Sequence, residues 1–159
     1  MLFFPYFPKL GSANELSRLY LTYALIDDQD VEITRFVRTF GDIIDKSAVA
    51  DSLFSDKPPG TAFVAAPAIG LRRLLGGQPN LAHDLRMARL MVGILPTLLL
   101  LLLLRREMQD LGVRPETRGI VLAGTGLGTL AFPYAMLLYG HQLVAVLLYA
   151  TYFLLQPRP

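Results

Sequence analysis

RMARLMVGILPTLLLLLLLRRE, residues 86–107, is the stretch that decides the fold class of this chain. The fifteen residues from Leu90 to Leu104 carry no charge, and pairs of arginines flank them on both sides. Crossing the hydrocarbon core of a bilayer takes roughly 20 apolar residues, and flanking arginines can extend a shorter run by reaching the interface with their head groups. The stretch therefore predicts a transmembrane helix.

The overall composition agrees with this interpretation. Of the 159 residues, 53% are hydrophobic and the mean hydropathy is +0.43, whereas a soluble domain is about 45–50% apolar by a count that also includes glycine. The apolar excess lies beyond residue 60, and the charges gather in residues 9–57 and in short clusters between the apolar runs. This layout predicts an all-α, polytopic membrane protein with a juxtamembrane helical segment on the outer side.

Two further apolar runs, Ile120–Leu138 and Leu143–Leu155, complete a set of about three predicted transmembrane helices within residues 88–156. Gly124, Gly126 and Gly128 would allow close helix contact in the first of these runs.

The loop at residues 105–118 carries four arginines, so the positive-inside rule makes it cytoplasmic. Residues 1–60, His83 and His141 are then expected on the outer side.

The outer segment, residues 1–60, should contain short helices. Residues 14–26 repeat apolar side chains at helical spacing, with Asn14 as the expected N-cap and a stop at Asp27–Asp30. A second amphipathic segment is expected at Val31–Phe40, and residues 41–55 show no clear period.

After the rigid turn Asp56–Gly60, residues 61–77 are too short and too charged for a full crossing. We expect an interfacial or re-entrant helix there, with a short true span left open as the alternative. The whole chain, residues 1–159, is thus interpreted as a single membrane domain. Its first residues, MLFFPYFPKL, resemble the end of a first membrane helix, which suggests a fragment of a longer protein.

Several classes of function find little support in the composition. The chain has no cysteine and two histidines, so disulfides and a thiolate or zinc centre are not expected. No block of lysine and arginine with interleaved aromatic residues appears, so nucleic acid is not an expected partner.

Glu15 and Arg18 lie three residues apart, on one face of the first predicted helix. They can form an ordinary surface ion pair, or they can act as a carboxylate for proton transfer and a cation for a phosphate. Lys57, in the sequence Asp56-Lys57-Pro58-Pro59-Gly60, lies at the expected boundary of water and lipid. It can belong to a plain loop-to-helix turn, or it can meet a lipid phosphate.

The run from Ser55, SDKPPGTAFVAAPAIGLRRLLGG, resembles the signature that follows the first outer loop of C-superfamily polytopic glycosyltransferases. The resemblance is to the branch of the bacterial aminoarabinose transferase and the protein O-mannosyltransferases. NELSRLYLTYALIDD is similar to the acidic helix of that family, and RMARLMVGILPTLLLLLLLRRE and GLGTLAFPYAMLLYGHQ are similar to two of its membrane helices. The similarity covers roughly residues 10–156, only the N-terminal portion of the family fold.

This resemblance implies an inverting sugar transfer from a polyprenyl-phosphate carrier to an acceptor on the outer face of a bacterial inner membrane. It implies Glu15 as the catalytic acidic residue, which activates the acceptor or organises the active site, and Arg18 and Lys57 as basic residues that bind the carrier phosphate. Asp56, Tyr20 and His141 would support the site.

The residues leave two other questions open. A divalent metal could take part, because Asp27, Asp28 and Asp30 can be ligands or solvated loop residues. The alternative function is a non-catalytic membrane remnant or a small membrane subunit that binds lipid or a protein partner.

Overall fold

The structure is a computed structural model, and it describes residues 11–156. Its contacts divide the chain into two compact units with a boundary between Ala88 and Arg89, where the sequence suggested a single membrane domain. The first ten residues, expected to end a membrane helix, lie outside the described part.

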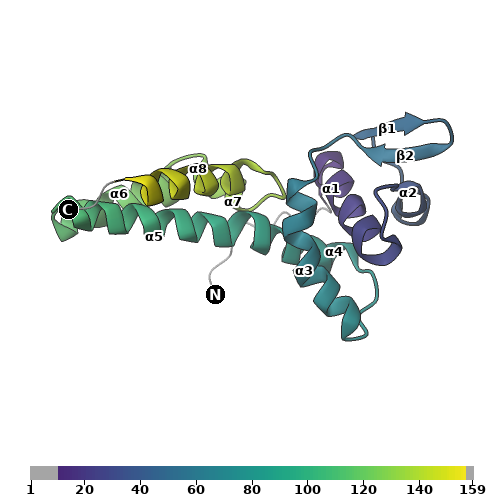
Figure 1. Cartoon of the computed structure of the whole chain (residues 1–159), viewed down its shortest axis with the longest axis horizontal. Helices are drawn as coiled ribbons and strands as arrows, with labels where there is room; N and C mark the ends of the chain where they lie inside the picture. The colour runs from purple at the N-terminus through teal and green to yellow at the C-terminus, as the bar shows by residue number, and fades with distance from the viewer. Residues whose placement is uncertain (1–10, 157–159) are drawn as a thin grey trace. The chain divides into compact units, whose positions relative to one another are not determined.

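The first unit holds α1 (Ala13–Tyr23), the π-helical turn η1 (Ala24–Asp28), α2 (Thr34–Phe40), β1 (Lys46–Val49), β2 (Ser52–Ser55), α3 (Gly60–Leu74) and most of α4 (Leu81–Arg89). The second unit holds the π-helical turn η2 (Leu90–Ile94), α5 (Leu95–Asp110), α6 (Pro115–Gly128), α7 (Ala131–Ala135) and α8 (His141–Leu155). The described residues are mainly helical (Figure 1), which confirms the all-α class in its coarse form.

α1 begins with a cap that the sequence analysis assigned wrongly. Ser12, not Asn14, is the N-cap, and the Glu15 carboxylate accepts a hydrogen bond from the Ser12 backbone N–H at 3.2 Å to form a capping box. Asn14 lies inside the first turn. At the other end, Gln29 takes a left-handed conformation (φ 54°) that ends η1, within the predicted stop.

The core of the first unit lies between α1 and α3, which pack on each other. α1 contributes fully buried Leu19, Tyr20 and Tyr23, and α3 presents the small side chains of Ala62 and Ala65. Because alanine is small, the two helix backbones can approach closely while the aromatic rings fill the remaining space. Burial of these apolar side chains is the main stabilising contribution to this unit.

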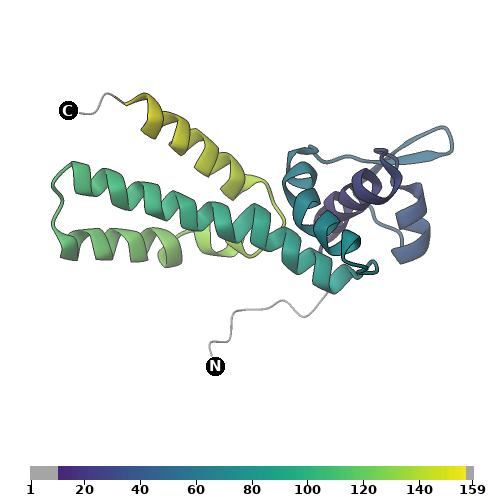
Figure 2. The ribbon, with the colours of Figure 1, turned by 60° about the horizontal axis from the view of Figure 1, so that its bottom comes forward.

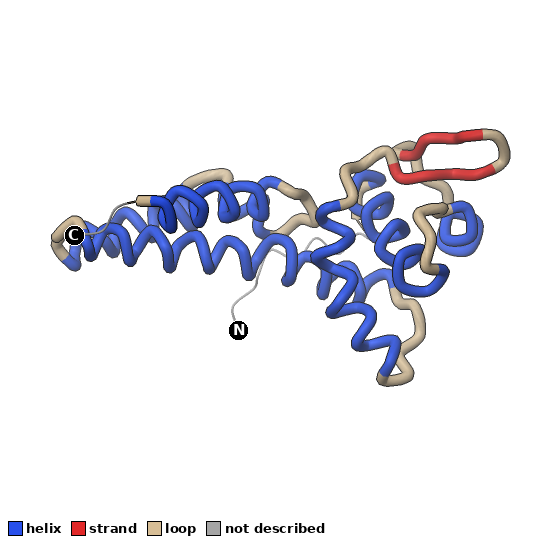
Figure 3. The backbone as a smooth tube through the Cα atoms, in the orientation of Figure 1, coloured by secondary structure: helices blue, strands red, loops and turns tan. Residues whose placement is uncertain are grey.

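Residues 41–55, which show no clear period in the sequence, contain an antiparallel hairpin. Lys46 pairs with Ser55 and Val49 with Ser52, and Figure 3 shows the two strands in red. Three of the four β1 residues are exposed, so the apolar alternation that announces a strand is missing. The hairpin is held by backbone pairing, which extends to the Ile33 N–H donating to the Leu53 carbonyl at 2.8 Å.

α3 confirms the helix expected after the Asp56–Gly60 turn. Pro59 is its N-cap and Gly60 its first residue, so the prolines stand where no helical N–H is needed. Whether α3 lies in a membrane interface stays a prediction.

α4, η2 and α5 run without a break from Leu81 to Asp110, a helix of 30 residues. Among residues 11–156 it is the one helix that is long and apolar enough to cross a membrane. At 1.5 Å per residue it is about 45 Å long, more than the hydrocarbon core requires. This helix contains the predicted crossing at residues 90–104.

The other two predicted spans do not form helices of that length. The run at residues 120–138 is broken, because α6 ends at Gly128 and Thr129 is extended (φ −122°, ψ −179°). The Thr129 hydroxyl then accepts a hydrogen bond from the Ala131 N–H at 3.1 Å and starts α7. Glycine lowers helix stability, so the apolar count overestimated the continuous helix. α8 has 15 residues.

The second unit turns much of its apolar surface outward. Figure 2 shows α5 flanked by α6 on one side and α8 on the other. Leu102 is 60% exposed, Ile120 74% and Leu148 68%, one from each of these helices. A water-facing bundle would bury such a stripe. The surface of this unit therefore has the character of one that faces lipid or another protein.

Candidate functional site

The first unit brings two of the predicted motifs together. The Ser17 hydroxyl on α1 lies 2.8 Å from the Ser55 hydroxyl at the end of β2. Ser17 directly precedes Arg18, and Ser55 accepts the Lys57 backbone N–H at 3.2 Å. The bond joins segments 38 residues apart, so α1 and the Asp56–Gly60 turn are neighbours in the fold.

This bond can be tested on its own. We expect Ser17→Ala and Ser55→Ala to be coupled by about 0.5–1.5 kcal/mol in a double-mutant cycle, the usual net contribution of a protein hydrogen bond. Denaturant unfolding of the detergent-solubilised chain measures it. Thr39→Ala is the control, since that exposed hydroxyl bonds only to the Arg35 carbonyl of its own helix. Additive effects of the two serine variants would show that the Ser17–Ser55 hydrogen bond does not contribute to stability.

Lys57 is held between two carboxylates. Its Nζ lies 3.2 Å from Asp45 Oδ2 and 3.2 Å from Asp56 Oδ2, and its side chain is 19% exposed. Burial lowers the pKa of Lys57, but the hydrogen bonds and charges of Asp56 and Asp45 outweigh burial and raise that pKa above the ordinary lysine value. Lys57 is therefore a charged ammonium with an acidic environment, to which Asp56 contributes one carboxylate.

Glu15 is buried, with 1% of its surface exposed. Its carboxylate serves the capping box, and a Cβ added at Gly11 would lie 2.9 Å from Glu15 Oε2. The backbone at Gly11 packs directly over the Glu15 side chain. An acceptor substrate therefore cannot reach the carboxylate without a local rearrangement. Arg18 donates hydrogen bonds to the backbone carbonyl and to the side-chain oxygen of Asn14.

The remaining predicted support residues are used structurally. Tyr20 is fully buried, its hydroxyl donates to the Gly41 carbonyl at 3.2 Å, and its ring stacks on Phe40. Burial, and then the charge of Asp42, raises the pKa of Tyr20. His141 belongs to the second unit, where its ring meets the edge of Tyr134 at 4.4 Å between centroids.

The acidic run after α1 does not form a metal site. Asp27 pairs with Arg73 at 3.2 Å, Asp28 pairs with Arg35 at 2.5 Å, and Asp30 accepts the N–H of Val31. Over residues 11–156, the structure contains no group of three or more His, Cys, Asp or Glu side chains that could hold a metal ion.

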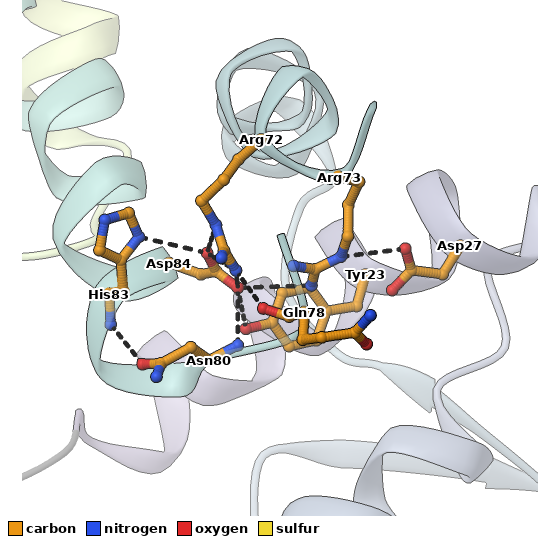
Figure 4. Close-up of polar contacts among 8 residues, drawn as sticks. All are labelled: Tyr23, Asp27, Arg72, Arg73, Gln78, Asn80, His83 and Asp84. Atoms are coloured by element: carbon orange, nitrogen blue, oxygen red, sulfur yellow. Dashed lines mark hydrogen bonds and ion pairs between the residues drawn. The ribbon is translucent and has the colours of Figure 1, made fainter. Parts of the chain in front are cut away.

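Sequence reasoning missed the most densely bonded polar cluster of the first unit, which centres on Asp84 (Figure 4). Asp84 is fully buried. Arg72 Nε donates to Asp84 Oδ1 at 2.8 Å, and Arg72 Nη2 donates to Oδ2 at 2.9 Å. Arg73 Nη2 lies 3.3 Å from the same Oδ2. Two guanidinium groups thus neutralise one buried carboxylate.

Two further groups complete this Asp84 cluster. The Tyr23 hydroxyl donates to Asp84 Oδ2 at 2.7 Å, and the Asn80 backbone N–H donates to it at 3.1 Å. Burial, and then the hydrogen bond to Asp84, raises the pKa of Tyr23 strongly, so its hydroxyl stays protonated as a donor. Arg73 also bonds Asp27, and its guanidinium lies 5.0 Å from the centre of the Tyr23 ring.

The Asp84 cluster ties α1, η1, α3 and α4 together. One signal in the sequence could have indicated it: Asp84 is the single acidic residue between Asp56 and Glu107, a stretch that contains six arginines. A lone carboxylate among so many cations in an apolar stretch has a partner inside the fold. The hydrogen-bond and ion-pair partners of Asp84 all belong to this unit. We therefore interpret the Asp84 cluster as structural.

Comparison with protein-family models, with curated proteins and with solved structures gave no match for this chain.

Proposed function

We propose that this chain is a membrane-associated, glycosyltransferase-like protein that handles a polyprenyl-phosphate-linked sugar on the outer face of a bacterial inner membrane. The observation that carries the proposal is the 2.8 Å bond between Ser17 and Ser55, because it brings the helix with Glu15 and Arg18 to the turn with Lys57. The resemblance of these two motifs to C-superfamily transferases supplies the chemistry.

Two features support a membrane location. The helix Leu81–Asp110 has the length and composition of a span. In addition, α5, α6 and α8 expose leucine and isoleucine side chains. Contact with lipid tails would remove this apolar surface from water, which is favourable. The polytopic arrangement belongs to the proposal, with α6 to α8 packing beside the long helix within the bilayer.

In the proposed reaction, an acceptor hydroxyl attacks the anomeric carbon of the sugar while the bond from that carbon to the carrier phosphate breaks. The acceptor proton passes to the Glu15 carboxylate. The departing phosphate gains negative charge, which the Arg18 guanidinium and the Lys57 ammonium would stabilise. Glu15 would have to leave its capping box for this step, since its carboxylate is covered by Gly11 in this structure.

The same burial of Glu15 favours the second candidate, a non-catalytic membrane subunit that binds a lipid phosphate. A side chain that caps a helix and is 1% exposed is fully employed by the fold. In that case Arg18 and Lys57 would bind the phosphate group, and no sugar would be transferred with any donor.

Lys57→Ala tests the proposal. We expect this variant to insert into membranes like the wild type but to lose sugar transfer from a polyprenyl-phosphate donor, because the charge on the leaving phosphate is no longer stabilised. Lys46→Ala is the matched control, since Lys46 begins β1 of the neighbouring hairpin and pairs with Asp42 instead. Insertion is measured by carbonate extraction and transfer by release of radiolabelled sugar from the carrier.

Transfer at the wild-type rate by Lys57→Ala would refute the role of Lys57. Binding of polyprenyl phosphate without transfer in the wild type would instead support the non-catalytic candidate.

A further inference from the structure

Two carboxylates flank the open end of the hairpin, just outside its strands. Lys46 and Ser55 are the last paired residues at its open end. Asp45 precedes β1, and Asp56 follows β2. Two carboxylates that approach the same ammonium are close enough to repel each other. The Lys57 ammonium, 3.2 Å from both, offsets that repulsion.

This arrangement gives Lys57 a negative environment. One positive and two negative charges leave a net charge of −1 around the ammonium. An anionic phosphate that approaches Lys57 therefore meets repulsion from the carboxylates as well as attraction from the ammonium. To contact Lys57 directly, the phosphate has to take the place of a carboxylate.

The two carboxylates differ in how they reach Lys57. Asp56 is the chain neighbour of Lys57, and its side chain is 33% exposed. Asp45 directly precedes β1, is 24% exposed, and meets Lys57 only because the hairpin folds back. Asp45 can therefore be changed without altering the Asp56–Gly60 turn.

We propose that Asp45 controls access of anionic ligands to Lys57 by competing with the ligand phosphate for the ammonium. This inference rests on the proposed function, in which Lys57 binds the carrier phosphate. Asp45 holds Lys57 in the ligand-free protein, and the phosphate displaces it on binding. Asp45 is thus a positioning residue whose loss strengthens binding, the opposite of what the loss of a supporting structural residue does.

Asp45→Asn tests this sign. We expect the full chain with this change to bind phosphatidylcholine vesicles that contain polyprenyl phosphate about two- to fivefold more tightly than the wild type, the factor that fits one partly exposed ion pair. Vesicles of phosphatidylcholine alone give the baseline. Asp42→Asn is the matched control: it removes the same charge from the same segment, but Asp42 pairs with Lys46, so no change is expected.

A second measurement does not depend on lipid binding. The chain has three lysines, Lys9, Lys46 and Lys57. Reductive ¹³C-methylation keeps their charge and labels these three amines and the α-amino group, and the Lys57 signal is assigned as the one missing in Lys57→Arg. The pKa of Lys57 should fall in Asp45→Asn and stay unchanged in Asp42→Asn, because Asp45 is one of the charges that raise it.

The outcomes separate the two proposals. If the wild type binds and Asp45→Asn binds equally or more weakly, the role of Asp45 is overturned and the proposed function still stands. An unchanged pKa of Lys57 in Asp45→Asn also overturns the role of Asp45 and leaves the proposed function standing. No binding by either protein overturns both. If inorganic phosphate displaces the protein from the vesicles at a concentration similar to that of polyprenyl phosphate, the competition with Asp45 is supported. The ligand in the proposed function would then be a free phosphate and not a lipid carrier.

Discussion

Asp84→Ala should unfold the first unit or bring it close to unfolding, with an expected loss of roughly 3–5 kcal/mol, as for other buried ion pairs that lose one partner. Asp84 is fully buried, and its two oxygens accept hydrogen bonds from Arg72, Arg73, Tyr23 and the Asn80 N–H. Without the carboxylate, two guanidinium groups remain in a poorly hydrated place with only Asp27 to balance them. The unpaired charge, more than the lost bonds, sets the size of the effect.

The measurement is thermal unfolding of the detergent-solubilised chain followed by circular dichroism, together with protease sensitivity of residues 11–88. Asp110→Ala is the control, because Asp110 forms an exposed pair with Arg106 on the surface of α5. It should change stability by about 0.5 kcal/mol or less. Asp84→Asn adds a second arm: it keeps an acceptor for the Tyr23 hydroxyl and removes the charge, so its loss should be large but smaller than that of alanine. An Asp84→Ala protein that melts with the wild type would contradict a stabilising role for the Asp84 cluster.

Gly93→Ala should destabilise the second unit, although alanine normally stabilises a helix relative to glycine by about 1 kcal/mol. A Cβ at Gly93 in η2 would lie 2.3 Å from the Ala135 carbonyl oxygen and 3.0 Å from its carbon. Both are backbone atoms of α7, so no side-chain rotation can relieve the clash. We expect a net loss of about 1–3 kcal/mol, the usual range for an overpacked core.

Gly124→Ala provides the same substitution with the opposite expected sign. Gly124 lies inside α6, and no atom lies within 4 Å of a Cβ placed there, so its change should be neutral or stabilising. Amide hydrogen exchange locates the effect: Gly93→Ala should speed exchange in residues 131–135, and Gly124→Ala should not. Equal stability of the two variants would show that α7 does not press on η2 as described.

The candidate site was predictable only in part. The motif resemblance selected Glu15, Arg18 and Lys57, and the bond between Ser17 and Ser55 places their segments side by side. The interaction partners of these three side chains were not predictable, because they depend on contacts that form only when the chain folds. Asp45 reaches Lys57 through a hairpin with no apolar alternation, and Glu15 is covered by a glycine that stands four residues earlier.

The Asp84 cluster shows the same division. Its acid and its arginines are visible in the sequence as charges in an otherwise apolar stretch, but Tyr23 lies 61 residues from Asp84. Such a distance along the chain carries no local pattern, so only the packing of α1 against α3 and α4 identifies the hydroxyl that completes the cluster.

By itself the sequence determined what depends on neighbours a few residues apart: the helical class, the long apolar helix around residues 90–104, the helix after the proline turn, and the end of the first helix at the acidic run. These follow from period, composition and backbone restriction. The tertiary structure decided the hairpin, the break at Thr129 and the partners of Asp84 and Lys57. The physical reason is that strand pairs and ion pairs form between groups that come together only when the chain folds. Because these groups are not neighbours in the sequence, no local pattern of residues indicates them.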